Sequence, residues 1–191
     1  MELSSHNGSK NHYNRGLYEG SWKGMKKFLE QDRLCPALRG RVTYDFTWYP
    51  KFGGCSAVFT VCLDRRAVKK FGYAYAAMAL AKKGLDQIRY IDDVKRVPPG
   101  EREEYTDLNF SRALGEYRHQ PIATSLASDD PIVRMFAIVD RRVGRRTLEK
   151  IKDTAEDQPD WLRPFYEARL AADGINAAGI GNREEGKEVS K

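Results

Sequence analysis

The sequence has few cysteines, no long hydrophobic run and a polar start. Its three cysteines, Cys35, Cys55 and Cys62, form no C-x-x-C pair, and an odd number without a signal peptide argues against a disulfide framework. The longest apolar run, YAYAAMALA at 73–81, is much shorter than the roughly 20 residues that cross a bilayer. Residues 1–18 lack the apolar segment of a signal peptide. We therefore expect a cytoplasmic protein in a reducing compartment.

Sequence motifs for common enzyme chemistry are also missing. There is no G-x-G-x-x-G segment, P-loop or G-x-S-x-G elbow. His119 is the single histidine outside the N-terminal segment, and because no partner for general-base catalysis is evident, we interpret it as a helix-end histidine that interacts with the helix dipole. His6 and His12 are too sparse for a metal site, and no cysteine has ligand spacing to them. We expect no metal, no cofactor and no catalytic residue.

The charge of the chain is unevenly distributed. With 191 residues and 41% hydrophobic residues, the chain can form one domain or two small ones. Residues 1–100 contain 18 Lys and Arg against 9 Asp and Glu, whereas residues 101–191 contain 15 against 18. This asymmetry, with a pI near 9.2, indicates that the first half faces an anionic partner such as nucleic acid, an acidic protein surface or a lipid headgroup. Solubility alone is the alternative explanation.

The first half of the chain predicts a helix followed by an antiparallel hairpin. Ser21 is a suitable N-cap for a helix that reaches about Gln31. Residues 42–49 alternate as in a half-buried strand, and residues 56–64, after a Pro and Gly break, predict the returning strand. A third strand over 64–70 is a further option. A helix over 73–83 then ends at Gly84.

The second half predicts helices, so the expected fold class is α+β: an N-terminal helix and an antiparallel hairpin of two or three strands, then a helical half. Leu108, Ala113, Leu114 and Tyr117 form one apolar stripe. Pro121 and Pro131 each begin a helix, and a last helix runs over about 159–173. The predicted division is a flexible N-terminal arm (1–18), a basic helix, hairpin and helix region (19–90), a linker loop (91–106), a helical region (107–175) and a disordered tail (176–191).

The stretch VDRRVGRR, Val139–Arg146, contains four arginines in eight residues. On a helical wheel, Arg134, Arg141 and Arg145 lie opposite the apolar stripe that includes Met135 and Phe136, and they are predicted to face solvent. Arg142 and Arg146 lie at the edge of the stripe, where we expect each guanidinium to bind an acidic partner.

Gly144 predicts a joint in this part of the chain. Beyond it, Leu148 and Ile151 are rotated away from the first apolar stripe by about 100°. Asp140 is placed to accept hydrogen bonds from amides that the joint leaves free. Three interpretations of the stretch stay open: a salt-bridged joint, which we favour, an anion-contacting face and an inert surface.

Three segments together form a signature: PALRGRVTY at Pro36–Tyr44, which follows a Trp-Lys helix, DDPIVRMFAIVDRRVGRR at 129–146 and YEARLAADGI at 166–175. This signature resembles that of a family of short, uncharacterised bacterial proteins that also occur on phages and other mobile elements. The resemblance covers most of residues 21–175 and implies no settled activity and no known catalytic residues. Residues 1–18, and the basic, alanine-rich segment after the hairpin, depart from the family pattern.

A metal-dependent nuclease is the catalytic alternative. Such an enzyme needs acidic ligands near the end of a strand and a lysine beside the scissile phosphate. Asp45 or Asp64, with the DDVK segment Asp92–Lys95, supplies these residue types. Because the DDVK segment is predicted to lie in a loop, a solvated charge run is the favoured interpretation.

The aromatic series Tyr44, Phe46 and Trp48 also has two interpretations. Sheet aromatics stack unpaired bases in single-strand binders, but such a stripe more often forms the core face beneath helices, which we favour here. Tyr49 and Phe52, beside Lys51 at the hairpin tip, are better candidates for an exposed contact.

We predict a non-enzymatic binding protein that docks on a nucleic acid or on a nucleoprotein complex and does not bind a membrane. Its most specific form is an inhibitor of a host guide-RNA effector, an anti-CRISPR; a metal-dependent nuclease and a plain DNA- or RNA-binding accessory protein are the alternatives. A protein of net charge +6 is a poor mimic of DNA, so such an inhibitor would bind beside the guide or through acidic C-terminal segments. The candidate contact residues are Lys26, Lys27, Arg39, Arg41, Tyr49, Lys51, Phe52, Arg65, Arg66, Lys69, Lys70, Lys82, Lys83, Arg134, Arg141 and Arg145.

Overall fold

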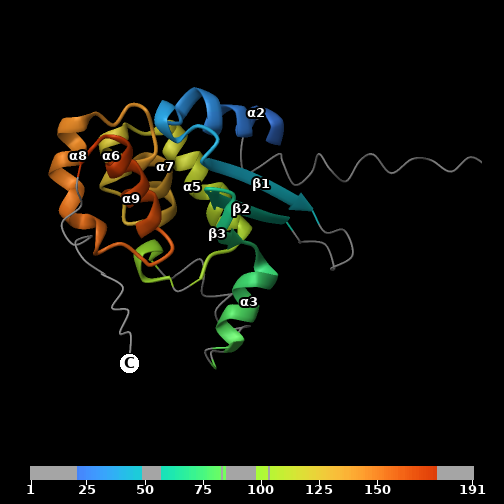
Figure 1. Ribbon diagram of the computed structural model, residues 1–191. Coiled ribbons are helices and arrows are strands. Elements are labelled where there is room, and N and C mark those ends of the chain that lie inside the picture. The colour runs from blue at the N-terminus through green and yellow to red at the C-terminus, as the bar shows by residue number, and fades with distance from the viewer. Residues whose placement is uncertain (1–20, 49–56, 83, 85–97, 103, 176–191) are drawn as a thin grey trace, which may run out of the picture.

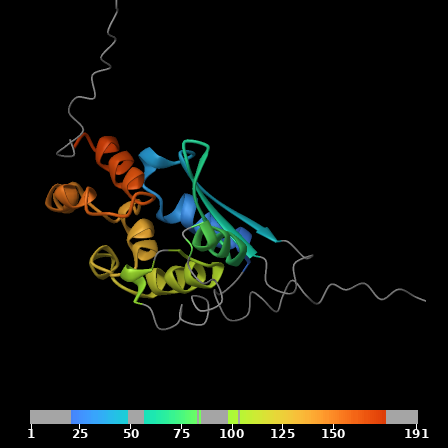
Figure 2. The same cartoon turned by 90° about the horizontal axis from the view of Figure 1, so that it is seen from below.

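The computed structural model describes residues 21–48, 57–82, 84, 98–102 and 104–175. An N-terminal helix precedes a three-stranded antiparallel sheet, and helices make up most of the described chain after it (Figure 1). The α+β class predicted from the sequence is confirmed. In both views the sheet lies at one side of the molecule and the later helices at the other (Figure 2).

The N-terminal helix changes its geometry halfway along. Helix α2 (Trp22–Lys27) begins at Ser21, whose side chain accepts a hydrogen bond from the Gly24 amide at 3.2 Å, so the predicted N-cap is confirmed. The next residues form a π-helix, η2 (Phe28–Arg33), where the sequence predicted a continuing α-helix to Gln31. A 3₁₀ turn, η3 (Pro36–Leu38), leads into the sheet.

The sheet has three strands in the order β1 (Val42–Trp48), β2 (Ala57–Leu63) and β3 (Arg66–Phe71). The predicted hairpin is confirmed, and the optional third strand forms. Asp64 and Arg65 connect β2 to β3 with φ of 50° and 66°. Two left-handed residues in a two-residue loop match the right-handed twist of the flanking strands.

The helices predicted to begin at Tyr73 and Pro131 begin there, whereas the last predicted helix begins later than expected. Thr106 and Asn109 form a capping box at the start of α5, and Asp130 accepts from the Ile132 amide at 2.8 Å at the start of α7. The last helix begins at Arg163, four residues after the predicted start. The elements are α3 (Tyr73–Lys82), η4 (Pro99–Glu101), α5 (Asp107–His119), α6 (Ile122–Leu126), α7 (Pro131–Ile138), α8 (Arg145–Ile151), η5 (Lys152–Ala155) and α9 (Arg163–Ala172).

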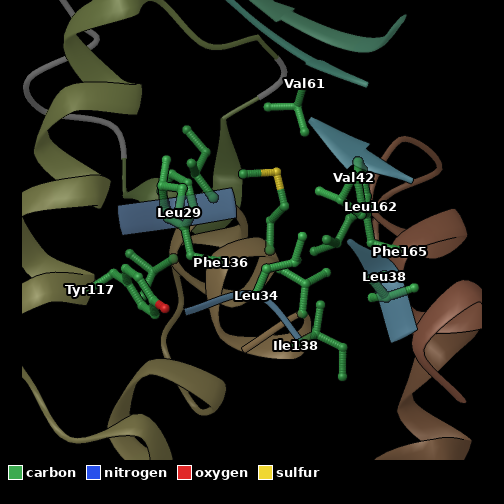
Figure 3. Packing of buried hydrophobic residues seen from close by; sticks show 14 of the residues in the cluster. Leu29, Leu34, Leu38, Val42, Val61, Tyr117, Phe136, Ile138, Leu162 and Phe165 are labelled. Carbon is green, nitrogen blue, oxygen red and sulfur yellow. The ribbon is translucent and has the colours of Figure 1, made fainter. Parts of the chain in front are cut away.

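One face of the sheet packs against α5 and α7 to form the core (Figure 3). Phe59 stacks on Phe110 with ring centroids 4.4 Å apart, and Tyr44 lies 5.9 Å from Phe136. The apolar stripe predicted for α5 was wrong at one position, because Leu108 is 49% exposed. No helix among the described residues has the length and apolar character needed to cross a membrane.

The interval 91–106, predicted as a linker loop, carries buried side chains in its described part. Tyr105 is buried between Phe71 and Trp161, with ring centroids 6.3 and 5.9 Å away. Arg102 is also buried and lies 4.0 Å from the Asp130 carboxylate. Residues 98–102 and 104–106 therefore pack onto both halves of the chain, while 91–97 and 103 lie outside the described residues.

Gly72 lies where the β3–α3 connection passes close to β2, so a substitution there tests this packing. A Cβ at this position would lie 2.9 Å from Val58 Cγ2 and 3.0 Å from the Ala57 carbonyl oxygen. Because a backbone atom cannot move aside cheaply, we expect Gly72→Ala to lower the free energy of unfolding by about 1–3 kcal/mol. Gly144→Ala is the control, since nothing lies within 4 Å of that Cβ, and it should cost less than about 1 kcal/mol. Equal shifts in urea denaturation would contradict this packing.

Candidate functional site

The joint between α7 and α8 is organised by the side chain of Asp140, which is fully buried. Its Oδ1 accepts a hydrogen bond from the Arg142 amide at 2.7 Å. Its Oδ2 accepts from the Tyr117 hydroxyl at 2.5 Å and from the Arg142 guanidinium at 2.9 and 2.6 Å. The predicted role of Asp140, to satisfy an amide freed at the joint, is confirmed, and the salt-bridged joint is the interpretation that the structure supports.

The protonation states around Asp140 follow from these contacts. Burial raises the pKa of Tyr117, and the nearby Asp140 carboxylate raises it further, so the phenol keeps its proton and donates. The hydrogen bond to Asp140 raises the pKa of Arg142. The buried negative charge is therefore matched by one positive charge and by neutral donors.

Backbone contacts connect the same joint to two distant segments. The Arg141 amide donates to the Arg33 carbonyl at 2.7 Å, and the Cys35 amide donates to the Val139 carbonyl at 2.8 Å. The buried Arg169 of α9 donates to the carbonyls of Asp140 at 3.1 Å and Val143 at 2.6 Å. The end of η2, the α7–α8 joint and α9 are thus held together at one place.

The arginines of VDRRVGRR, Val139–Arg146, agree with the prediction except at Arg146. Arg142 binds the predicted acidic partner. Arg146 was predicted to do the same, but it is exposed and has no ion pair within the part of the chain that the structure describes. Arg141 and Arg145 are exposed, as predicted. Arg145 contacts Glu149 at 3.0 Å and the Asp173 carbonyl at 2.8 Å.

Arg134 does not face solvent freely, so that prediction was wrong. Its Nε donates to Gln158 Oε1 at 3.0 Å and its Nη1 to the Ser128 carbonyl at 2.6 Å. The side chain is half-buried because α6, η5 and α9 surround the end of α7 on which it lies. A helical wheel of one isolated helix does not include these neighbours.

Three arginine side chains, those of Arg33, Arg118 and Arg142, gather around Phe28 and Tyr117. Together with the exposed Arg141, whose backbone is bonded to that of Arg33, we call them the arginine cluster. The guanidinium carbons of Arg33 and Arg118 lie 5.2 and 5.6 Å from the centroid of the Phe28 ring. That ring lies 6.3 Å from the Tyr117 ring, over which the Arg142 guanidinium carbon lies at 5.7 Å. The amide of Arg141 is bonded to the Arg33 carbonyl, which completes the cluster.

The π-helix is the reason that Arg33 reaches Phe28. Residues i and i+5 of an α-helix are roughly 140° apart around the axis, whereas a π-turn joins residue i to residue i+5. Phe28 and Arg33 are the first and last residues of η2. Sequence reasoning missed Phe28, Arg33 and Arg118 as a group because it assumed an α-helix here and because the Arg118 contact spans 90 residues.

Three of the four cluster arginines have no carboxylate partner in the described part of the chain. Arg33, Arg118 and Arg141 form no ion pair there, whereas Arg142 pairs with Asp140. By contrast, five predicted contact residues are paired within the protein: Lys26 with Asp45 (2.9 Å), Lys27 with Asp32 (3.7 Å), Arg41 with Asp64 (2.8 Å), Arg145 with Glu149 (3.0 Å) and Lys69 with Glu104 (2.6 Å). The last pair is largely buried, with 16% and 15% exposed side chains, so Lys69 is a structural residue.

The other predicted contact residues are scattered. Arg65 and Arg66 are exposed at the β2–β3 turn, and Lys82 is exposed at the end of α3. Arg39 donates to the Gln31 carbonyl at 3.2 Å, and the Lys70 ammonium lies 4.8 Å from the Tyr75 ring. The positions Tyr49, Lys51, Phe52 and Lys83 lie outside the described residues. The structure brings none of the scattered residues into the arginine cluster.

Two residues of the aromatic series of β1, Tyr44 and Phe46, belong to the core, as the favoured interpretation predicted. Tyr44 is 1% exposed. Phe46 lies 5.7 Å from Trp22 and 5.1 Å from Phe59, measured between ring centroids. Trp48 is half-buried and is not part of the core cluster. A base cannot stack on the rings of Tyr44 and Phe46 where other side chains already cover them.

Of the acidic residues considered for a nuclease, the structure describes Asp45 and Asp64, and both are bound to basic side chains. Asp45 pairs with Lys26, and Asp64 pairs with Arg41 through two hydrogen bonds. The Asp64 amide donates to the carbonyl of Arg41, and Arg41 precedes Asp45 by four positions. Four positions correspond to about 14 Å along a strand. No group of three or more metal-ligating side chains occurs in the described ranges, and Asp92–Lys95 lies outside them.

His119 lies at the C-terminal end of α5, as the sequence predicted. Its Nδ1 is 2.8 Å from the Gly115 carbonyl oxygen, one of the carbonyls near the helix end that an imidazole N–H can satisfy.

Two variants test the joint. Arg142→Ala leaves the buried Asp140 carboxylate without its cation, so we expect it to lower the free energy of unfolding by about 1–3 kcal/mol. Arg146→Ala removes an exposed, unpaired side chain and should change it by less than about 0.5 kcal/mol. Chemical denaturation of both variants beside the parent protein provides the measurement. If Arg146→Ala is as destabilising as Arg142→Ala, the assignment of the two side chains is wrong.

Comparison with known proteins identifies the family to which the chain belongs. No curated protein and no solved structure matches the chain. The SF0329 protein family matches residues 21–170, which include the sheet, the arginine cluster and the Asp140 joint. Because this match covers most of the sequence, the chain belongs to the SF0329 protein family.

Proposed function

We propose that this protein is a non-enzymatic binding protein that contacts the phosphate backbone of a nucleic acid, free or within a nucleoprotein complex, through the arginine cluster. The observation that carries the proposal is the pair of guanidiniums, Arg33 and Arg118, held on the Phe28 ring without a carboxylate among the described residues. Positive groups that lack a counter-charge within the protein are available to an external anion.

The geometry of the cluster suits phosphate. A guanidinium presents its N–H donors at the edge of a plane, and a stacked ring occupies its face. Arg33 and Arg118 are half-buried, so part of their side-chain entropy is already lost before a partner binds. Arg141, exposed next to Arg33, extends the positive surface toward solvent.

The proposed contact surface differs from the one that the excess of Lys and Arg in residues 1–100 indicated. Lys26, Lys27, Arg41 and Lys69 have acidic partners within the protein, so their charges contribute little to an external field. The cluster instead joins η2 of the first half to α5 and the α7–α8 joint of the second. A π-helical segment, which often marks a functional site, lies at its centre.

The narrower hypothesis, inhibition of a guide-RNA effector, is supported by the resemblance to mobile-element proteins and stays a prediction. In this form the cluster would bind phosphates of the guide or the target strand within the effector. That arrangement removes the difficulty that a protein of net charge +6 cannot mimic DNA.

A charge-removal experiment tests the proposal. Binding of short fluorescein-labelled RNA, single-stranded DNA and duplex DNA is measured by anisotropy at several KCl concentrations. The double variant Arg33→Gln and Arg118→Gln should weaken binding, and the slope of log K against log salt should become shallower by about 1.4–1.8, for two phosphate contacts at 0.7–0.9 each.

The matched control removes the same charge elsewhere. Lys82→Gln with Lys150→Gln takes one exposed lysine from α3 and one from α8, helices that contribute no residue to the arginine cluster. This control should keep the parent slope. An equal loss in both double variants would show a diffuse basic surface, and no binding of any of the oligonucleotides would overturn the proposal.

A further inference from the structure

A pocket of about 470 Å³ lies between α6, α8, η5 and α9, outside the arginine cluster. Its volume is within the range of roughly 300–1,000 Å³ that holds small ligands. Most of the surface that it offers is apolar, supplied by side chains such as Ala123, Leu126 and Ile151. The pocket therefore accepts an apolar body of limited size.

One cation lines this pocket. Arg134 is bonded through Nε to Gln158 and through Nη1 to the Ser128 carbonyl, and both partners are neutral. No carboxylate pairs with Arg134 in the part of the chain that the structure describes. A half-buried guanidinium that is held by neutral acceptors keeps its full charge for an anion that enters the pocket.

The buried Tyr166 lies beside this cation. Burial raises the pKa of Tyr166, and the neighbouring Arg134 acts in the opposite direction. At neutral pH the phenol is uncharged, so it does not supply the missing negative charge. It can instead donate a hydrogen bond to an anion next to the guanidinium.

We propose that the pocket binds a small organic monoanion, namely a carboxylate attached to a short apolar body. The carboxylate would lie against Arg134 and Tyr166, with the apolar part against Leu126 and Ile151. A nucleotide or another phosphate dianion fits less well, because Arg134 is the one basic residue among the described residues that line the pocket. This binding site is independent of the arginine cluster, so the two proposals stand or fall separately.

Calorimetric titration with 4-phenylbutyrate and hexanoate tests the site, with 4-phenyl-1-butanol as a neutral analogue. We expect saturable 1:1 binding of the carboxylates and at least about tenfold weaker binding of the alcohol, since it lacks the charge-assisted bond. Arg134→Gln should bring the affinity for 4-phenylbutyrate down to that for the alcohol.

A second pair of variants tests the pocket without changing Arg134, because the hydrogen bonds of Arg134 also support the fold. Ala123→Phe places a ring in the pocket from an exposed helix position and should abolish binding. Thr124→Phe, one residue along α6, is exposed and does not line the pocket, so it should bind normally. Equal binding of acid and alcohol, unchanged binding in Ala123→Phe, or no saturable binding of either carboxylate below about 10 mM would overturn the proposal.

Discussion

A carboxylate that is removed from water, as that of Asp140 is, has to be met by hydrogen-bond donors, because an unpaired buried charge is strongly destabilising. Tyr117 from α5 and the side chain and amide of Arg142 provide these donors. The backbone on either side of Asp140 binds η2 and Arg169 of α9. The side chain thus fixes the place where η2, the α7–α8 joint and α9, which are far apart in sequence, meet in space.

The arginine cluster is a consequence of that joint. Because the Arg141 amide is bonded to the Arg33 carbonyl, the end of η2 cannot move away from the α7–α8 connection. Tyr117, which donates to Asp140, also lies next to Phe28 and beneath Arg142. The same contacts that satisfy one buried carboxylate therefore bring positive charge to the neighbouring surface. Within VDRRVGRR, Arg142 binds Asp140, while Arg141 is exposed.

A surplus of basic residues in a stretch of sequence is a poor guide to where a protein is electropositive. Lys69 is bonded to Glu104, 35 positions away, and Lys26 to Asp45, 19 positions away. These pairs cancel charge that the count along the chain assigns to the surface. Arg33, Arg118 and Arg134 have no carboxylate partner among the described residues, and none of them stands next to another Lys or Arg in the sequence. The two proposed sites depend on this distinction between charge that is present and charge that is available.

Local chemistry along the sequence determined the helix start at Ser21, the alternation that buries Tyr44 and the Asp130-Pro131 start of α7, because these depend on backbone geometry within a few residues. It also determined that Asp140 would bind nearby amides. The tertiary structure alone decided the π-helical turn that places Arg33 over Phe28, the pairing of Lys69, the exposure of Arg146 and the burial of Arg134. The Lys69–Glu104 pair and the bonds of Arg134 to Ser128 and Gln158 need neighbours from outside their own elements, and no periodicity within one segment contains that information.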